Sequence, residues 1–223
     1  MPNDIIKISP SNLSFLWDDC KGCFWEVTVN RNPRPSGPFP SIFNTLDLLQ
    51  KKALMNLRSE NITVDGLTIP LPKGELIVGD LRVQSTSILS IEGKDFVLAG
   101  KMDCGYQFED ATTGIVDYKT AKPKDDYFIK YGRQLNAYRH CLEHPYIGVP
   151  EKVSRLGLMY FTPSSFEVRD GGMSASCGFD VKWVDVDFLD MVESKFGKEL
   201  ASVLSFKTAP EHERMCQYKR HYR

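Results

Sequence analysis

VLAGKMDCGYQFEDATTGIVDYKTAKPKDDYFIKYGRQLNAY, residues 97–138, is the stretch that decides the fold of this chain. Two apolar-rich runs lie on either side of a polar, glycine-containing turn at residues 109–114, and a helical pattern of apolar residues follows. These features predict a β-hairpin that leads into a helix. We therefore expect an α/β fold: a small mixed sheet with this hairpin at its centre, flanked by helices.

The hairpin predicts a pair of facing carboxylates. If it turns near Asp110, antiparallel partners have residue numbers that sum to about 220, and Asp103 then lies opposite Asp117. Two like charges placed directly opposite each other are destabilising, and a hard cation between them removes the repulsion. Asp117 and Lys119 are two residues apart and share one face of their strand. The sequence therefore predicts a site for Mg²⁺ or Mn²⁺ beside an ammonium group.

These side chains suit the hydrolysis of phosphodiester bonds. A bound metal ion polarises a phosphoryl oxygen and lowers the pKa of a bound water. Lys119 could orient that water or offset charge in the transition state. Gln134 and Tyr138, four residues apart on the predicted helix, project from one side of it and could reach back to the site. Each feature alone has a simpler interpretation, because a single Asp on a strand is usually solvated and a D-x-K sequence is often an ion pair.

Three motifs taken together resemble those of the PD-(D/E)XK nuclease superfamily: GKMD at residues 100–103, VDYKT at 116–120 and QLNAY at 134–138. The chain looks most similar to the RecB-like branch, which includes the iron–sulfur nucleases of CRISPR adaptation. The resemblance implies a restriction-endonuclease-like core that hydrolyses single- or double-stranded DNA. It implies metal ligation by Asp103, Asp117 and the carbonyl of Tyr118, catalysis by Lys119, and a trailing helix motif of Gln134 and Tyr138.

Cysteines near both ends of the chain indicate a second site. Cys20 and Cys23 form a C-x-x-C pair, and Cys216 lies close to the end. From the residues alone, the pair could be zinc or iron–sulfur ligands, a redox dithiol or incidental thiols. Iron–sulfur members of the RecB-like branch carry cysteines at both ends, so the resemblance favours a cluster. A cubane requires four thiolates, whereas three cysteines with His212 or His221 would suit zinc. The other cysteines, Cys104, Cys141 and Cys177, are expected to be small buried side chains.

The composition is that of an ordinary globular protein, with 42% hydrophobic residues, 26% charged residues and a net charge of −1. We expect one domain over residues 1–223, in which the two ends form a cysteine-bearing subdomain. Because the net charge is near zero, contact with DNA must use a local basic patch. The sequence has neither a signal peptide nor a long apolar span, so we expect a cytoplasmic location without membrane contact.

Periodicity predicts helices at residues 41–57, 127–143 and 187–204 and strands at 153–163 and 179–186. RecB-like nucleases commonly supply a His or Glu from a helix upstream of the hairpin, and the helix at 41–57 has neither. Asn44 and Asp47 are its polar candidates. This departure leaves a second hypothesis, in which the chain is a catalytically weak or inactive nucleic-acid-binding or scaffold protein with the same fold.

Overall fold

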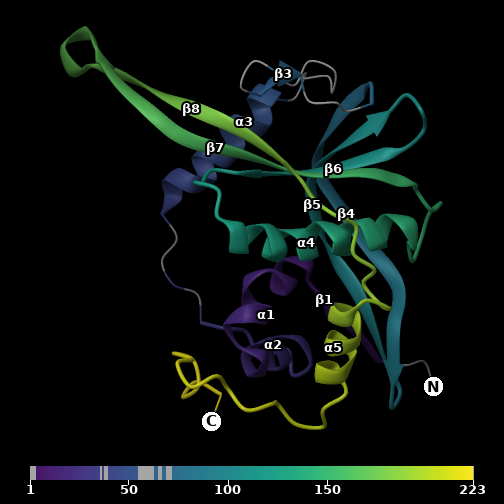
Figure 1. Cartoon of the computed structure of the whole chain (residues 1–223). Helices are drawn as coiled ribbons and strands as arrows, with labels where there is room; N and C mark the ends of the chain where they lie inside the picture. Colours follow the sequence, from purple (N-terminus) through teal and green to yellow (C-terminus); the bar gives the residue numbers. More distant parts are fainter. Residues whose placement is uncertain are drawn as a thin grey trace.

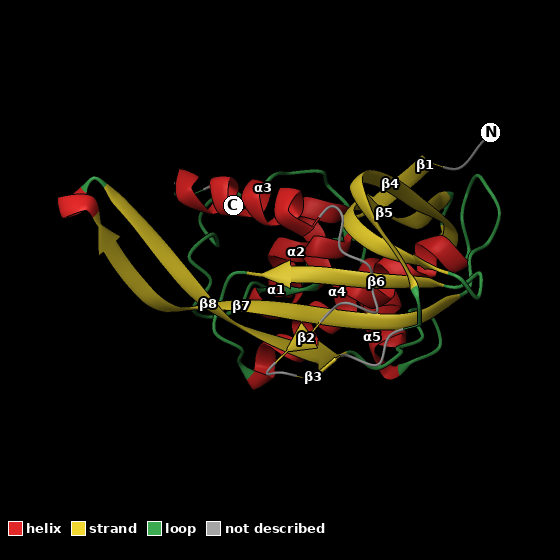
Figure 2. Cartoon of the chain, turned by 90° about the horizontal axis from the view of Figure 1, so that it is seen from above, coloured by secondary structure: helices red, strands yellow, loops and turns green. Residues whose placement is uncertain are grey.

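A six-stranded mixed β-sheet forms the centre of the molecule in this computed structural model, which describes residues 4–35, 37, 40–54, 63–64, 67–68 and 72–222 (Figures 1 and 2). The strands of the sheet are β1 (Asp4–Ile8), β4 (Gly74–Ile91), β5 (Lys94–Phe108), β6 (Thr113–Lys119), β7 (Val153–Arg169) and β8 (Ser174–Asp185). A separate antiparallel pair consists of β2 (Thr63–Val64) and β3 (Leu67–Thr68). The predicted mixed α/β class is confirmed.

β5 is a central strand of the sheet and pairs with β1, β4 and β6. The strand order is β1-β5-β6-β7-β8, and β4 pairs with β5 along the opposite edge of that strand. The β1–β5 and β6–β7 pairs are parallel, and the others are antiparallel. In the hairpin, Gly105 lies opposite Ile115 and Tyr106 opposite Gly114. The register predicted from the turn is therefore confirmed for these pairs.

The helical elements are the 3₁₀ turn η1 (Pro10–Leu13), α1 (Phe15–Asp19), α2 (Lys21–Thr28), α3 (Ser41–Leu54), α4 (Asp125–Glu143) and α5 (Lys195–Leu204). Helices α1, α2, α4 and α5 lie together on one side of the sheet, whereas α3 lies apart from them (Figure 1). Leu135 of α4 packs with Ile115 of β6 and Leu158 of β7 in one buried core. Trp17 of α1 and Phe24 of α2 pack edge to face in a second core, with ring centroids 5.0 Å apart.

The first two predicted helices are present with shifted ends. α4 begins at Asp125, two residues before the predicted start. α3 runs from Ser41 to Leu54, and residues 55–57 of its predicted range lie outside the described part of the chain. The strand predicted at 153–163 continues to Arg169, and the strand predicted at 179–186 begins at Ser174.

The prediction of a helix over residues 187–194 is wrong. The carboxylate of Asp190 accepts hydrogen bonds from the backbone N–H groups of Val192 and Glu193, each at 2.7 Å. Ser194 then caps α5 by accepting a hydrogen bond from the Gly197 N–H at 3.0 Å. Such side-chain bonds compete with helix formation and fix where a helix can begin. The apolar periodicity continued through this turn, so it could not reveal the break.

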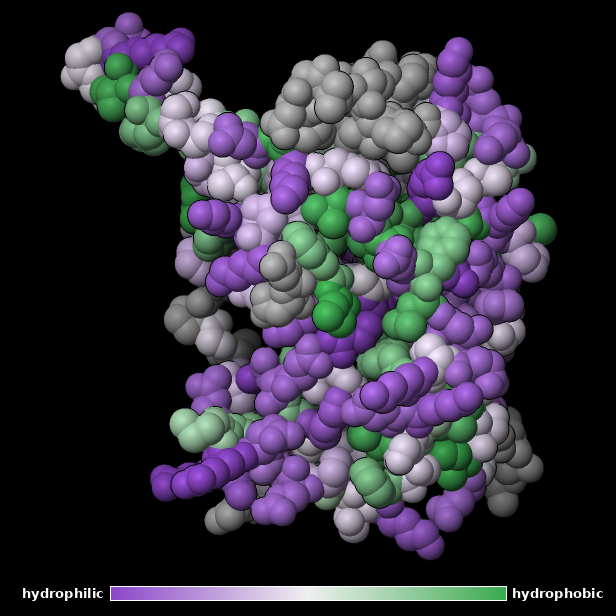
Figure 3. All heavy atoms as spheres, viewed as in Figure 1, coloured by the Kyte–Doolittle hydropathy of each residue, from purple (hydrophilic) through white to green (hydrophobic). Residues whose placement is uncertain are grey.

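β7 and β8 continue beyond the sheet as a projecting hairpin, on which hydrophobic and hydrophilic side chains are interspersed (Figure 3). Phe166, Val168 and Met173 are exposed on it. Cys177 also lies there and is exposed, so the prediction that it is buried is wrong, because this part of β8 has left the core. Within the described ranges, we find no helix with the length and apolar character needed to cross a membrane.

His140 of α4 makes stability sensitive to acid. Its ring centroid lies 4.6 Å from that of His144, and burial, followed by the charge of His144, lowers the pKa of His140 to about 4. The unfolded chain takes up this proton near pH 6.5, before the folded chain does. We therefore expect the free energy of unfolding to fall as the pH drops from 6.5 to 4, by on the order of 2 kcal/mol from this residue. Urea denaturation at several pH values measures the fall, and His140→Gln should make it shallower. An unchanged slope in the variant would contradict this.

Candidate functional site

An ion pair on β6 lies at the centre of the first candidate site. The Nζ of Lys119 is 2.5 Å from a carboxylate oxygen of Asp117, and these side chains are 19% and 16% exposed. The same ammonium lies 4.0 Å from the centre of the Tyr131 ring on α4. Val116 and Tyr118 pack in the core on the other side of the sheet. Asp117 and Lys119 therefore share a partly buried face of β6, the face that packs against α4.

The charge of Asp117 acts on two neighbouring tyrosines. Burial, and then the charge of Asp117, raises the pKa of Tyr160 on β7 to about 12. Burial and the same carboxylate also raise the pKa of Tyr131. Both phenols therefore stay protonated at neutral pH and remain hydrogen-bond donors. The site combines a carboxylate, an ammonium and two phenols in a region from which much of the water is excluded.

The β5–β6 ladder ends just before this site. Its last pair is Gly105–Ile115. The same register continued by two residues places Asp103 on β5 opposite Asp117 on β6. The side chain of Asp103 lies outside the described part of the structure, so the convergence of the two carboxylates stays a prediction.

α4 contacts β5, the strand that carries the GKMD motif. The hydroxyl of Tyr138 donates a hydrogen bond to the carbonyl of Lys101 at 2.8 Å. A Cβ added at Gly100 would lie 2.8 Å from Pro10 and 3.1 Å from the Tyr138 ring, so this close approach requires glycine. Gln134, one turn earlier on α4, is half-buried. Tyr138 thus fixes β5 two residues before the predicted metal ligand.

We expect Tyr138→Phe to lower the free energy of unfolding by about 1–2 kcal/mol, because it removes the part-buried hydrogen bond from the Tyr138 hydroxyl to the carbonyl of Lys101. Urea denaturation measures the loss. Tyr146→Phe, which changes an exposed tyrosine, is the matched control and should leave stability unchanged. Equal stabilities of the two variants would contradict the holding role of Tyr138.

Three aromatic rings cluster at the start of α4, next to the ion pair on β6. Phe15 of α1 contacts Tyr127 and Tyr131 edge to face, with ring centroids 5.4 and 5.3 Å apart. The ammonium of Lys124 lies 5.1 Å from the Tyr127 ring, and that of Lys130 lies 5.3 Å from the Phe15 ring. Lysines interleaved with half-buried rings are typical of surfaces that bind single-stranded nucleic acid. The sequence did not reveal this cluster, because α1 and α4 are far apart in the chain.

α3 reaches the end of β6 through Gln50, whose Oε1 accepts a hydrogen bond from the Thr120 hydroxyl at 3.2 Å. Asn44 and Asp47, the upstream candidates from the sequence, are exposed. Asp47 pairs with Lys51 on the same helix at 2.9 Å. α3 therefore contacts the end of β6 through the side-chain amide of Gln50, a residue that the sequence did not indicate.

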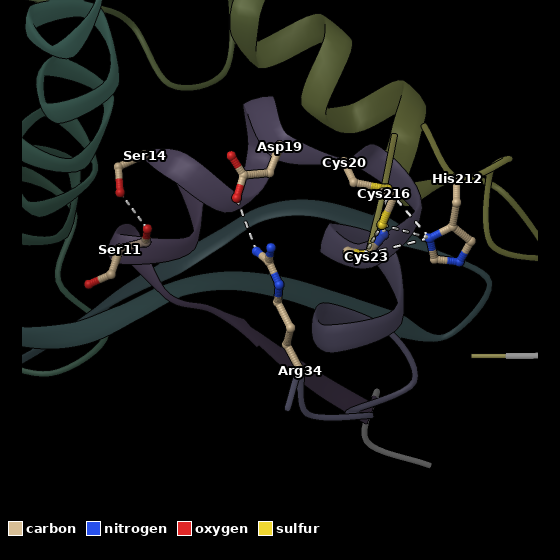
Figure 4. Close-up of polar contacts among 8 residues, drawn as sticks. All are labelled: Ser11, Ser14, Asp19, Cys20, Cys23, Arg34, His212 and Cys216. Carbon is tan, nitrogen blue, oxygen red and sulfur yellow. Dashed lines mark hydrogen bonds and ion pairs between the residues drawn. The ribbon is translucent and has the colours of Figure 1, made fainter. Parts of the chain in front are cut away.

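The second candidate site joins the two ends of the chain. Cys20, Cys23, His212 and Cys216 point toward one another, and one ligand atom from each lies within 4.8 Å of the others (Figure 4). The Nδ1 of His212 is 3.4 Å from the Sγ of Cys20 and 3.5 Å from that of Cys23. The sulfurs of Cys23 and Cys216 are 3.3 Å apart. These four side chains could hold a metal, and His212 is the histidine that completes the group.

Local sequence explains why the sulfurs meet. Cys20 is the N-cap residue of α2, and its sulfur accepts a hydrogen bond from the Cys23 N–H at 3.4 Å. The C-x-x-C spacing therefore places both sulfurs at the first turn of the helix. A Cβ at Gly22 would lie 2.8 Å from the carbonyl oxygen of Pro210 and 3.0 Å from the His212 ring. Glycine at this position lets the C-terminal segment approach.

Burial and charge oppose each other among the thiols. Burial, followed by the neighbouring thiols, raises the pKa of Cys23. Burial also acts to raise the pKa of Cys216, but hydrogen bonding from Cys23 and the nearby positive charge of Arg34 bring it below its usual range. Arg34 is itself held by Asp19 at 3.1 Å. A bound cation would stabilise the thiolates, since metal binding displaces their protons.

No family model matches the chain, and no curated protein sequence matches it either. Among solved structures, the chain is similar to that of SSO0001, with a TM-score of 0.50 and 13% sequence identity. The aligned region covers 92% of this chain and 78% of the other. At this identity the similarity concerns the fold alone, and it agrees with a mixed α/β architecture over nearly the whole chain.

Proposed function

We propose that this chain is a divalent-metal-dependent nuclease that hydrolyses DNA on a restriction-endonuclease-like core. The observation that carries the proposal is the partly buried pair of Asp117 and Lys119, 2.5 Å apart on one face of β6. If the register of the hairpin continues for two residues beyond the Gly105–Ile115 pair, Asp103 would lie opposite Asp117. Metal-dependent phosphodiester hydrolysis uses carboxylates that bind a cation and positive charge that faces the phosphate. The GKMD, VDYKT and QLNAY motifs, which resemble those of PD-(D/E)XK nucleases, support the same conclusion.

In this mechanism Asp103, Asp117 and the carbonyl of Tyr118 would hold Mg²⁺ or Mn²⁺, and the bound ion would supply Lewis-acid activation of the phosphate and of a water. The ammonium of Lys119 offsets the negative charge that grows on the phosphoryl oxygens. The Tyr131 ring holds that ammonium at the site through a cation–π contact. The Tyr131 hydroxyl, kept protonated, remains available to donate a hydrogen bond to the substrate.

The aromatic cluster beside the ion pair supplies a surface for the substrate. Bases stack on exposed ring faces without regard to sequence, and lysines between the rings contact phosphates. We propose that Lys124 and Lys130, beside the rings of Phe15 and Tyr127, supply the local positive charge that a chain with nearly zero net charge needs to contact DNA.

For the cysteine site we infer one zinc ion with a structural role. Tetrahedral zinc, with bonds of about 2.3 Å to sulfur and about 2.0 Å to nitrogen, separates its ligand atoms by roughly 3.5–3.8 Å. The distances from His212 Nδ1 to the three sulfurs are 3.4, 3.5 and 3.9 Å. A four-iron cluster binds each ligand to a different iron, so its ligands must lie further apart. These distances favour zinc over the iron–sulfur cluster that the resemblance implies.

Cleavage of labelled single- and double-stranded DNA by the purified protein tests the nuclease proposal. We expect cleavage with Mn²⁺ and none with EDTA, and calorimetry should detect Mn²⁺ binding. Cleavage that persists in EDTA, or its absence on both substrates with Mn²⁺, would overturn the proposal.

Elemental analysis of protein purified without oxygen tests the second site. We expect about one zinc per chain and colourless protein. A brown protein that absorbs at about 400 nm would instead show an iron–sulfur cluster.

A second candidate function is nucleic-acid binding without cleavage. The exposure of Asp47 favours it, because Asp47 is the acidic residue that α3 was expected to supply and it lies on the solvent-exposed surface of that helix, paired with Lys51. Calorimetry separates the two candidates, since a protein that only binds nucleic acid has no need of Mn²⁺ at the hairpin.

A further inference from the structure

Tyr160 of β7 is a fully buried side chain whose hydroxyl has no hydrogen-bond partner among the described residues. The exposed fraction of this residue is 0%, and none of the described groups bonds to its hydroxyl oxygen. A buried hydroxyl without a partner costs free energy, because it has given up its hydrogen bonds to water. Buried polar groups of this kind are uncommon in native proteins, and a role at a functional site is one explanation for them.

The strand register places Tyr160 beside the ion pair on β6. β6 and β7 are parallel, and Lys119 lies directly opposite Tyr160. Paired residues of neighbouring strands point to the same face of a sheet, and so does Asp117, two residues before Lys119. The Tyr160 ring packs with Leu135 of α4 in one buried core. The phenol and the ion pair therefore lie on the same face of the sheet, the face that packs against α4.

The core fixes the ring of Tyr160. Phe128 of α4 contacts it edge to face, with ring centroids 5.9 Å apart. Leu158, two residues earlier on β7, is buried in the same core. Packing, and not a hydrogen bond, therefore sets where the hydroxyl lies.

The carboxylate of Asp117 is close enough to act on this phenol. Burial raises the pKa of Tyr160 to about 12, and the charge of Asp117 adds to the effect of burial. The phenol keeps its proton at neutral pH and can donate a hydrogen bond. A carboxylate is the acceptor that such a buried donor would favour, because hydrogen bonds to charged groups are stronger than those between neutral groups.

A cation at this site would change what Asp117 requires. The ammonium of Lys119 lies 2.5 Å from one of its oxygens, and a divalent cation would compete with that ammonium for the carboxylate. Carboxylates that bind metal ions are themselves usually held by hydrogen bonds from neighbouring groups, which fix their orientation. Tyr160 is a buried donor on the correct face and in the adjacent strand.

We propose that Tyr160 is a positioning residue of the candidate metal site, whose hydroxyl donates a hydrogen bond to the carboxylate of Asp117 when that carboxylate binds the divalent cation. The phenol acts through Asp117 and, being fully buried, does not contact the substrate. Without the cation its hydroxyl costs stability, and the hydrogen bond formed on cation binding recovers that cost. The inference rests on the proposed function, because it requires a cation at the hairpin.

The test compares wild-type protein with Tyr160→Phe, which keeps the packed ring and removes only the hydroxyl. Calorimetry should show that Mn²⁺ binds about tenfold more weakly to the variant, the loss expected when a metal ligand loses a hydrogen bond that orients it. Without added Mn²⁺ the melting temperature should stay the same or rise, because the variant no longer buries an unpaired hydroxyl. A lower melting temperature would show that the hydroxyl already has a partner, and it would overturn the proposal.

Tyr106→Phe is the matched control. Tyr106 is also 0% exposed, but its ring packs in the core on the other side of the sheet. This variant should bind Mn²⁺ like the wild type. Equal losses of Mn²⁺ affinity in the two variants, or an unchanged affinity of Tyr160→Phe, would reject the positioning role.

The dependence of DNA cleavage on Mn²⁺ concentration separates positioning from a direct part in the reaction. Tyr160→Phe should need about tenfold more Mn²⁺ for its half-maximal rate and should recover most of the wild-type rate at saturating Mn²⁺. A rate that stays low at saturation, with unchanged Mn²⁺ affinity, would contradict the inference.

The binding and cleavage measurements also distinguish this inference from the proposed function. Wild-type protein that binds Mn²⁺ more tightly than Tyr160→Phe, yet cleaves no DNA, keeps the inference and removes the nuclease proposal. Cleavage by wild-type protein, together with unchanged Mn²⁺ affinity and cleavage in Tyr160→Phe, does the reverse. Wild-type protein that binds no Mn²⁺ would overturn both.

Discussion

Asp117→Asn and Lys119→Ala should each lower the rate of Mn²⁺-dependent DNA cleavage by at least about a thousandfold. Asparagine keeps the size of the side chain and removes the charge that would hold the cation. Alanine removes the ammonium that lies 2.5 Å from Asp117 and would face the phosphate. Both groups are largely buried, so water cannot easily replace them.

The two substitutions should differ in how they act. Asp117→Asn should weaken Mn²⁺ binding in calorimetry, whereas Lys119→Ala should keep Mn²⁺ affinity and lose only the rate. β8 offers a matched control, since Asp180 and Lys182 repeat the D-x-K spacing at exposed positions. Asp180→Asn and Lys182→Ala should cleave like the wild type. Normal cleavage by both β6 variants would exclude the assignment of the site.

The central hairpin could be predicted because its information is local. The turn sets the register, and the period of two then fixes that Asp117 and Lys119 share a face. The start of α5 was missed for the opposite reason. There, the side chains of Asp190 and Ser194 accept hydrogen bonds from backbone N–H groups, and these bonds override an apolar pattern that alone predicts a longer helix.

Contacts between residues that are far apart in the chain were harder to predict from the sequence. The choice of His212 over His221 depends on how the C-terminal segment passes Gly22, which no spacing in the sequence specifies. The contact of Phe15 with Tyr127 likewise depends on how α1 packs against α4. The motifs did carry one tertiary signal, since the glycine of GKMD is the residue that Pro10 and Tyr138 approach closely.

Cys23→Ser should remove the terminal metal and lower the melting temperature by at least about 10 °C, because structural zinc contributes directly to folding free energy. The Cys23 sulfur lies within 3.5 Å of both the His212 nitrogen and the Cys216 sulfur. Replacing it therefore removes one of the four ligand atoms that would bind the metal. Calorimetric melting with elemental analysis measures both effects. Cys177→Ser, at an exposed cysteine of the projecting hairpin, is the control and should retain metal and melting temperature.

His212→Cys distinguishes metal binding from simple packing, because a fourth thiolate still completes a tetrahedral site. This variant should keep its zinc and most of its stability, whereas loss of packing alone would destabilise it as much as Cys23→Ser. A chelator should lower the melting temperature of the wild type and leave that of Cys23→Ser unchanged. Wild-type metal content and stability in Cys23→Ser would contradict the site. Because different elements carry the ion pair on β6, the Mn²⁺-dependent rate per folded molecule should survive the loss of the terminal metal.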